Sequence, residues 1–216
     1  MKKESLKLLY QDKWIAIADK PFGLATQGTA DGDSPHLYGQ LCAAFPYVGL
    51  HHRLDTPASG LVLFTLDRTA NKAISDGFRR HEIDRRYIAV VAGDPGEHGS
   101  WTTPIDGKPA TTHFTRLGSA QGMSVIEAKL ETGRTHQIRI HASKAGYPII
   151  GDRRHGGMAG RLWPRLALHA VYLSLRHPRT PQIVSVCSQI PTDLEQLVLP
   201  RCPHLDQRYS PATSAD

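Results

Sequence analysis

The chain has 216 residues, of which 40% are hydrophobic and 21% charged, and 26 basic residues against 20 acidic ones give a net charge of +6. This length and balance are typical of one globular domain with a substantial core, and they exclude a disordered or collagen-like chain. No apolar run approaches the roughly 18–20 residues that cross a bilayer, and the three cysteines form no CxxC pair. We therefore expect a cytoplasmic protein without a disulfide framework.

The first third of the chain predicts two strands, a helix, a buried strand and a second helix. Apolar alternation marks the first strands, and a serine followed by proline is a typical helix start. The expected ranges are residues 6–10 and 14–18 for a strand pair, a helix capped by Ser34 that runs to Phe45, residues 61–66 for the buried strand, and residues 69–80 for the second helix.

Strands dominate the remainder. They are expected at residues 87–91, 111–117, 123–130, 166–175 and 183–186, with a turn-rich connection at 96–107, a helix from a Thr135 cap to Ala145 and a short helix at 191–199. Strands outnumber helices and do not alternate regularly with them, which predicts an α+β fold with a mixed, mostly antiparallel sheet. We expect one catalytic domain over residues 1–199 and a loose polar tail over residues 200–216.

The segment of residues 51–60 (HHRLDTPASG) gathers two imidazoles, a guanidinium and a carboxylate immediately before the buried strand. Its second half is turn-forming, so Asp55 is expected on a loop at the edge of the sheet, where reactive side chains often lie. The alternative is a capped turn in which Asp55 only bonds nearby amides.

A second dense segment is residues 132–141 (TGRTHQIRIH). A helix that begins near Thr135 places Arg139 in its first turns, where the helix dipole favours anions. An arginine there indicates a task such as holding a carboxylate or phosphate, and the alternative is a surface ion pair. A metal site is not expected, because there is no HExxH motif and His136 and His141 are five residues apart.

Taken together, these segments resemble the RluA family of RNA pseudouridine synthases, in a short form without an S4 domain. The resemblance covers about three quarters of the chain and depends on five motifs in the family's order. These are His52-Arg53-Leu54-Asp55 with Ser59-Gly60, residues 86–93 (RYIAVVAG), residues 133–141, residues 148–152 (PIIGD) and Leu168-His169-Ala170.

The resemblance implies the family's fold, with a central catalytic cleft, and an isomerase that converts uridine in RNA to pseudouridine without cofactor or metal. It makes Asp55 the catalytic residue, Tyr87 the ring that stacks on the target base and assists proton removal, and Ile138 the aliphatic side chain beneath the uracil. Arg139 would pair with the aspartate, and Arg53 would enter the space that the flipped nucleotide vacates. A base must leave its stack for this chemistry, at a cost of a few kcal/mol.

The sequence departs from the family pattern at Pro57 and Ala58 in the Asp55 loop, and His155 replaces a tyrosine. An alternative is therefore a catalytically silent RNA-binding module on the same scaffold. Ribosomal RNA, transfer RNA or both are the expected substrates, bound by a monomer. The arginines expected to contact RNA are Arg79, Arg80, Arg85, Arg86, Arg153, Arg154, Arg161 and Arg165.

Overall fold

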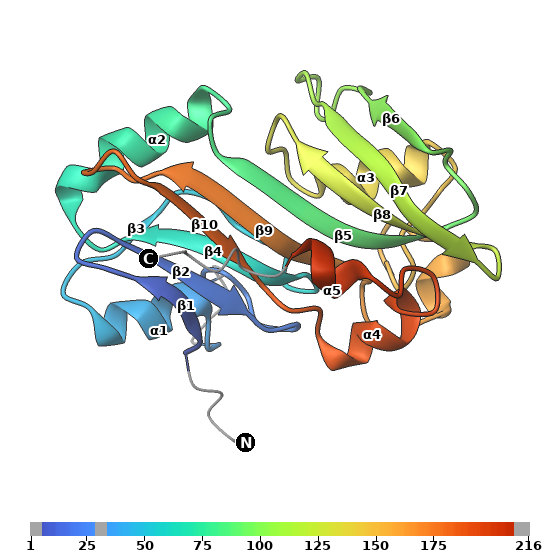
Figure 1. Ribbon diagram of the computed structural model, residues 1–216, viewed down its shortest axis with the longest axis horizontal. Helices are drawn as coiled ribbons and strands as arrows, with labels where there is room; N and C mark the ends of the chain where they lie inside the picture. Colours follow the sequence, from blue (N-terminus) through green and yellow to red (C-terminus); the bar gives the residue numbers. More distant parts are fainter. Residues whose placement is uncertain (1–5, 29–33, 210–216) are drawn as a thin grey trace. The chain divides into compact units, whose positions relative to one another are not determined.

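The structure is a computed structural model that describes residues 6–28 and 34–209. The chain divides into two compact units, each built from two stretches of sequence (Figure 1). Unit 1 comprises Met1–Ile83 and Leu173–Ser188, and unit 2 comprises Asp84–Tyr172 and Gln189–Asp216. Within the described ranges, no helix is long and apolar enough to cross a membrane.

Unit 1 is a small antiparallel sheet with two helices. Its elements are β1 (Leu8–Gln11), β2 (Ile15–Lys20), α1 (Leu37–Ala44), β3 (Gly49–Leu50), β4 (Ser59–Thr65), a 3₁₀ turn (Arg68–Ala70), α2 (Asn71–Arg79) and β10 (Ile183–Cys187). β2 pairs with both β1 and β4, and β3 also pairs with β4. Alternate residues of β2 and β4, such as Ile15, Ile17, Leu61 and Leu63, share one apolar core, as the period of a strand requires.

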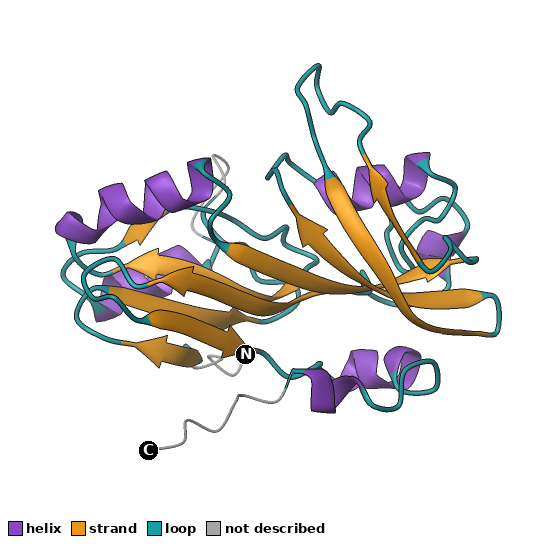
Figure 2. Cartoon of the chain, turned by 45° about the horizontal axis from the view of Figure 1, so that its top comes forward, coloured by secondary structure: helices purple, strands orange, loops and turns teal. Residues whose placement is uncertain are grey.

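Unit 2 contains the strands that are neighbours in the order β5-β8-β7-β6 within the sheet. Its elements are β5 (Asp84–Ala92), β6 (His98–Trp101), β7 (Thr112–Ala120), β8 (Met123–Leu130), α3 (Gln137–Lys144), a 3₁₀ turn (Ala159–Arg161), α4 (Thr192–Val198) and α5 (Leu205–Arg208). The strands of this series are antiparallel to their neighbours (Figure 2). β9 (Leu168–Arg176) is one strand whose first five residues belong to unit 2 and whose last four belong to unit 1. The fold is α+β with a largely antiparallel sheet and flanking helices, as expected.

Two helix starts differ from the prediction. α1 begins at Leu37, and its N-cap is His36 rather than Ser34, because His36 Nδ1 accepts the Gly39 N–H at 2.9 Å. α3 begins at Gln137 after His136, which has a left-handed φ of 55° and makes no side-chain cap bond. β6 lies inside the segment that was expected to be only a turn-rich connection.

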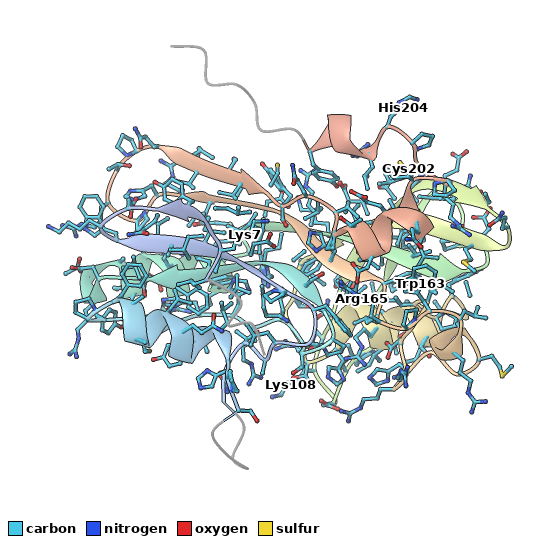
Figure 3. All side chains as sticks on the ribbon, turned by 90° about the horizontal axis from the view of Figure 1, so that it is seen from below. Lys7, Lys108, Trp163, Arg165, Cys202 and His204 are labelled. Atoms are coloured by element: carbon cyan, nitrogen blue, oxygen red, sulfur yellow. The ribbon has the colours of Figure 1, made fainter. Side chains whose placement is uncertain are left out.

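The prediction of a loose tail is wrong for residues 201–209. Arg201, Leu205 and Tyr209 are buried, and α5 follows α4 after the loop that carries Cys202 and His204 (Figure 3). Leu205 is the first residue of α5 and Tyr209 directly follows its last residue, and two apolar positions four residues apart are a signal too short to stand out among polar neighbours. Arg201 fixes the segment by donating to the carbonyl oxygens of Leu197 at 2.6 Å and of Ala120 at 3.1 Å. Residues 210–216 lie outside the described part of the chain.

Candidate active site

Residues 51–58 form the loop that joins β3 to β4 in unit 1. The Asp55 carbonyl accepts the Ala58 N–H at 2.9 Å, which closes a turn directly after the carboxylate. The Asp55 side chain is partly exposed, whereas its neighbour Leu54 is buried. The loop therefore presents Asp55 at the surface of a well-packed segment, as the sequence predicted.

Thr26 fixes the chain on one side of Asp55. Its hydroxyl is buried, donates to the Leu54 carbonyl at 2.8 Å and accepts the Leu54 N–H at 3.1 Å. A single threonine thus satisfies both backbone groups of the residue before Asp55, which limits how that residue can rotate.

Lys20 fixes the chain on the other side. It lies at the end of β2, is fully buried and donates to the carbonyl oxygens of Pro21 at 3.0 Å, Leu24 at 2.6 Å and Thr56 at 3.3 Å. A buried ammonium requires such partners, because its desolvation is costly. The roles of Lys20 and Thr26 were not predicted; the signal available was a lysine shortly after the apolar run of residues 15–18.

Arg53 lies in the same loop and is exposed. Of the other arginines expected to contact RNA, Arg79, Arg80, Arg153, Arg154 and Arg161 are exposed, and Arg85 and Arg86 are partly exposed. The prediction is wrong for Arg165, which is buried and bonds both carboxylate oxygens of Asp193 at 3.0 and 3.2 Å.

The second predicted segment forms the start of α3 in unit 2, and Gln137 anchors it. The buried Gln137 side chain accepts from the Thr132 hydroxyl at 2.7 Å and the Arg134 N–H at 2.9 Å, and it donates to the Thr111 carbonyl at 2.9 Å and Thr112 Oγ1 at 3.0 Å. All four positions of its amide group are used, so the loop, α3 and the start of β7 are held together.

Arg139 makes a bidentate ion pair with Asp152 in unit 2. Its Nε and Nη2 donate to the two carboxylate oxygens at 2.8 Å each, and the side chains are only 5% and 1% exposed. Burial by itself raises the pKa of Asp152, but the Arg139 hydrogen bond and charge and the backbone N–H groups of His155 and Arg154 hold that pKa below its ordinary value.

This pair decides between the two interpretations of Arg139. The arginine holds a carboxylate, as one interpretation expected, and a surface ion pair is wrong because both side chains are buried. Asp152 was expected only as part of a motif, and its role as the partner of Arg139 was not predicted. The predicted pairing of Arg139 with Asp55 stays a prediction.

The other two predicted substrate contacts also lie in unit 2. Tyr87 is on β5, opposite Ala128 of β8, and is 5% exposed. Ile138 is in the first turn of α3 and is 4% exposed. Unit 2 therefore carries Tyr87, Ile138 and Arg139, and unit 1 carries Asp55 and Arg53. In the described part of the chain, no group of three or more His, Cys, Asp or Glu side chains could hold a metal ion.

Comparison with known proteins decides the family. The family model described as RNA pseudouridylate synthase matches residues 15–144, which include Asp55, Tyr87 and Arg139. The chain belongs to the RNA pseudouridylate synthase family. Members of this family isomerise uridine in RNA to pseudouridine, and RNA is therefore the substrate of this pseudouridine synthase. The expected RluA-type membership is confirmed.

Individual relatives agree with this assignment. The chain is 30% identical to "Ribosomal large subunit pseudouridine synthase D" of Xanthomonas campestris pv. campestris, over 89% of this chain and 68% of that protein. It is 31% identical to "Uncharacterized RNA pseudouridine synthase YhcT" of Bacillus subtilis, over 89% of this chain and 71% of the relative. The solved structure titled "Human RNA Pseudouridylate Synthase Domain Containing 1" matches with a TM-score of 0.74 and 24% identity, over 99% of this chain and 98% of that one. The last match shows the fold alone.

Proposed function

We propose that Asp55 is the catalytic residue of this pseudouridine synthase. The observation that carries the proposal is the construction of its loop, in which buried Thr26 and Lys20 fix the residues on both sides of a partly exposed carboxylate. Such a construction suits a reactive group, because the geometry is set by the fold before substrate binds.

The reaction breaks the N1–C1′ bond of uridine, turns the uracil and forms a C5–C1′ bond; C5 loses its hydrogen and N1 takes up a proton. A carboxylate such as that of Asp55 can serve either as a nucleophile at C1′ or as a base toward the sugar. A glycoside hydrolase normally uses two carboxylates and an activated water. One essential carboxylate fits a reaction that keeps the base in the site.

The remaining roles follow the family resemblance. Tyr87 stacks on the target base and assists removal of the proton, Ile138 packs beneath the uracil, and Arg139 pairs with the catalytic carboxylate. Arg53 fills the space that the flipped nucleotide leaves in the RNA. The buried Arg139–Asp152 pair supports its part of this scheme, because it fixes the guanidinium before substrate arrives.

The proposed substrate is a uridine in ribosomal RNA, transfer RNA or both, and the relatives named for the ribosomal large subunit favour ribosomal RNA. We further propose that the protein acts in the cytoplasm as a monomer, without cofactor or metal, and that residues 1–199 work as one catalytic domain.

The test is to map pseudouridine in total RNA, by carbodiimide labelling and reverse transcription, from cells with and without the gene. A site that is lost on deletion and restored by wild type, but not by Asp55→Asn, identifies the substrate and the catalytic residue together. The matched control is Asp106→Asn, which removes the same charge from an exposed turn residue and is expected to restore the site. Restoration by Asp55→Asn would overturn the proposal.

A further inference from the structure

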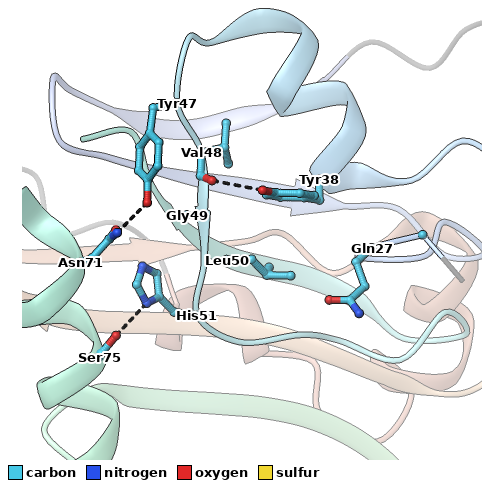
Figure 4. A pocket seen from close by; sticks show the side chains of 10 residues that line it. Gln27, Tyr38, Tyr47, Val48, Gly49, Leu50, His51, Asn71 and Ser75 are labelled. Carbon is cyan, nitrogen blue, oxygen red and sulfur yellow. Dashed lines mark hydrogen bonds between the residues drawn. The ribbon is translucent and has the colours of Figure 1, made fainter. Parts of the chain in front are cut away.

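Unit 1 contains an open cavity of about 720 Å³ whose lining does not include Asp55 or Arg53. Figure 4 shows Tyr47, Asn71, His51 and Ser75 along one side of it, with Gln27 on the opposite side. Tyr38 lies between them and donates to the Val48 carbonyl at 3.2 Å. Residues 48–50 also line it. Among the described residues that line it, in the ranges 6–28 and 34–209, none is Asp, Glu, Lys or Arg.

The side of the cavity that carries Tyr47, Asn71, His51 and Ser75 is called the polar wall below. Its side chains are joined, through Thr65, by a continuous chain of hydrogen bonds. Thr65 donates to Asn71 Oδ1 at 2.6 Å, and Asn71 Nδ2 donates to the Tyr47 hydroxyl. Since the Thr65 proton is used there, Thr65 Oγ1 accepts from His51 Nε2, at 3.0 Å. Burial lowers the pKa of His51, so its other nitrogen, Nδ1, is an acceptor at neutral pH and receives the Ser75 hydroxyl proton, at 3.2 Å.

These directions determine what the polar wall offers to a ligand. The Tyr47 hydroxyl accepts within the chain of bonds, which leaves its own O–H to donate into the cavity. Ser75 donates within the chain, which leaves its lone pairs to accept. Gln27 adds an amide with both a donor and an acceptor. The cavity therefore presents uncharged donors and acceptors together with aromatic rings, which matches the edge and face of a nucleobase.

A cation lies beside the polar wall. The Arg68 guanidinium is 5.2 Å from the centroid of the Tyr47 ring, and the side chain is exposed. Arginine binds phosphate through paired N–H groups. A base in the cavity and its phosphate at Arg68 would together account for both features.

We propose that this cavity binds an unpaired nucleotide of the RNA substrate, other than the target uridine. The proposal rests on the family's RNA substrate and adds a second nucleotide site within unit 1. The chain itself links the two sites, because His51 precedes Asp55 by four residues, a span of at most about 14 Å. A nucleotide held here would help to select the sequence or loop around the target.

Binding is tested on the full chain by NMR titration with each of the four ribonucleoside 5′-monophosphates and with a mixed-sequence pentaribonucleotide. The expected result is a saturable shift of the Gly49, His51 and Ser75 amide signals by at least one monophosphate, and saturation by the pentaribonucleotide at a concentration about tenfold lower. No shift at these signals with any probe would overturn the proposal. Equal affinity for the monophosphate and the pentaribonucleotide would overturn the assignment to RNA in favour of a free nucleotide.

Ser75→Glu and Ala73→Glu form a matched pair, because both residues are exposed on α2 and both changes lower the net charge by one. Only Ser75 lines the cavity. Ser75→Glu is expected to weaken binding about tenfold, the loss of roughly one bound base, and Ala73→Glu less than about twofold. Equal weakening by both changes, or the same shifts with inorganic phosphate alone, would overturn the nucleotide site.

The outcome is separable from that of the catalytic proposal. Asp55→Asn is expected to lose pseudouridine formation and to retain the NMR shifts. In the wild-type protein, pseudouridine formation without nucleotide binding in the cavity would overturn only the second site. Pseudouridine formation by Asp55→Asn, with the NMR shifts retained, would overturn only the catalytic role of Asp55.

Discussion

The guanidinium of Arg139 and the carboxylate of Asp152 form a two-bond ion pair, 2.8 Å at each hydrogen bond, that is almost completely removed from solvent. Removing one charge of such a pair leaves the other charge buried, with nothing to compensate for its desolvation. We expect Asp152→Asn to lower the free energy of unfolding by about 3–5 kcal/mol and to reduce turnover, because Arg139 is no longer held by a charge. Urea denaturation and single-turnover pseudouridine formation measure the two effects.

The control for this change is Asp76→Asn. Asp76 pairs with Lys72 and Arg79 on the surface of α2, where both cations are well exposed, so little change in stability is expected. A similar loss of stability in the two variants would show that burial of the Arg139 pair has no special effect.

Thr26 offers a test of how the catalytic loop is held. Thr26→Val keeps the shape of the side chain and removes both hydrogen bonds to Leu54. It should reduce the free energy of unfolding by about 1–3 kcal/mol, the usual cost of buried polar groups without partners. Turnover should fall as well, since Asp55 follows Leu54 directly. Thr115→Val, at an exposed position of β7, serves as the control; normal turnover by Thr26→Val would separate the loop from catalysis.

Tyr87 is proposed to act through both its ring and its hydroxyl group. Tyr87→Phe keeps the ring, so RNA affinity should be unchanged while the rate of the chemical step falls about 10²-fold or more. Tyr87→Ala should in addition weaken RNA binding by about 1–3 kcal/mol, the contribution of one stacked base. Filter binding and single-turnover kinetics separate these effects, with thermal denaturation as a check on folding because Tyr87 is 5% exposed. Weaker binding by Tyr87→Phe would argue against stacking as the main contact.

The packed segment of residues 201–209 leads to a prediction that concerns stability alone. The Tyr209 hydroxyl donates to the buried Glu127 carboxylate, and burial together with this hydrogen bond raises the pKa of Tyr209 far above its ordinary value. Tyr209→Phe removes the donor and should cost about 1–3 kcal/mol of unfolding free energy, with turnover unchanged. The comparison is Tyr147→Phe, whose hydroxyl group makes none of the hydrogen bonds described for residues 6–28 and 34–209. Equal melting temperatures for the two variants would contradict the prediction.

Many of the strands could be predicted from the local pattern of apolar and polar residues. The antiparallel pair β7 and β8 follows from alternation on either side of a short turn, and the buried β4 follows from a continuous apolar run. The helix starts were less accessible, because His36 caps α1 with an imidazole nitrogen and His136 precedes α3 in a left-handed conformation. Neither arrangement follows from the usual capping residues.

The candidate site was predicted in part for a similar reason. Asp55 and Arg139 stand in dense motifs that a single sequence can reveal. The partner of Arg139 is thirteen residues away and across a turn, and the lysine that fixes Thr56 is thirty-six residues before it. No periodicity relates residues at such separations; they meet only because the sheets and loops bring them together.

Buried His141 leads to a prediction about how the free energy of unfolding depends on pH. Its Nε2–H donates to the Thr103 carbonyl at 2.8 Å and its Nδ1 accepts from the Thr112 hydroxyl at 2.9 Å. Burial lowers the pKa of His141 even though the Thr103 bond opposes this shift, so the folded state keeps the imidazole neutral. Below the unfolded value of 6.5, the unfolded chain binds more protons than the folded one. Stability contributed by His141 is therefore complete above that pH and declines as the pH falls toward 5.

Urea denaturation between pH 7.5 and pH 5 measures this slope. His141→Asn is expected to be less stable at pH 7.5 but to lose less stability on acidification. His51, whose pKa burial also lowers, contributes to the same window, so the slope should decrease without vanishing. The control is His204→Asn, a change at an exposed position that is expected to alter stability little. An unchanged slope in His141→Asn would contradict the prediction. It would mean that the folded protein protonates this imidazole without cost, despite its two buried hydrogen bonds.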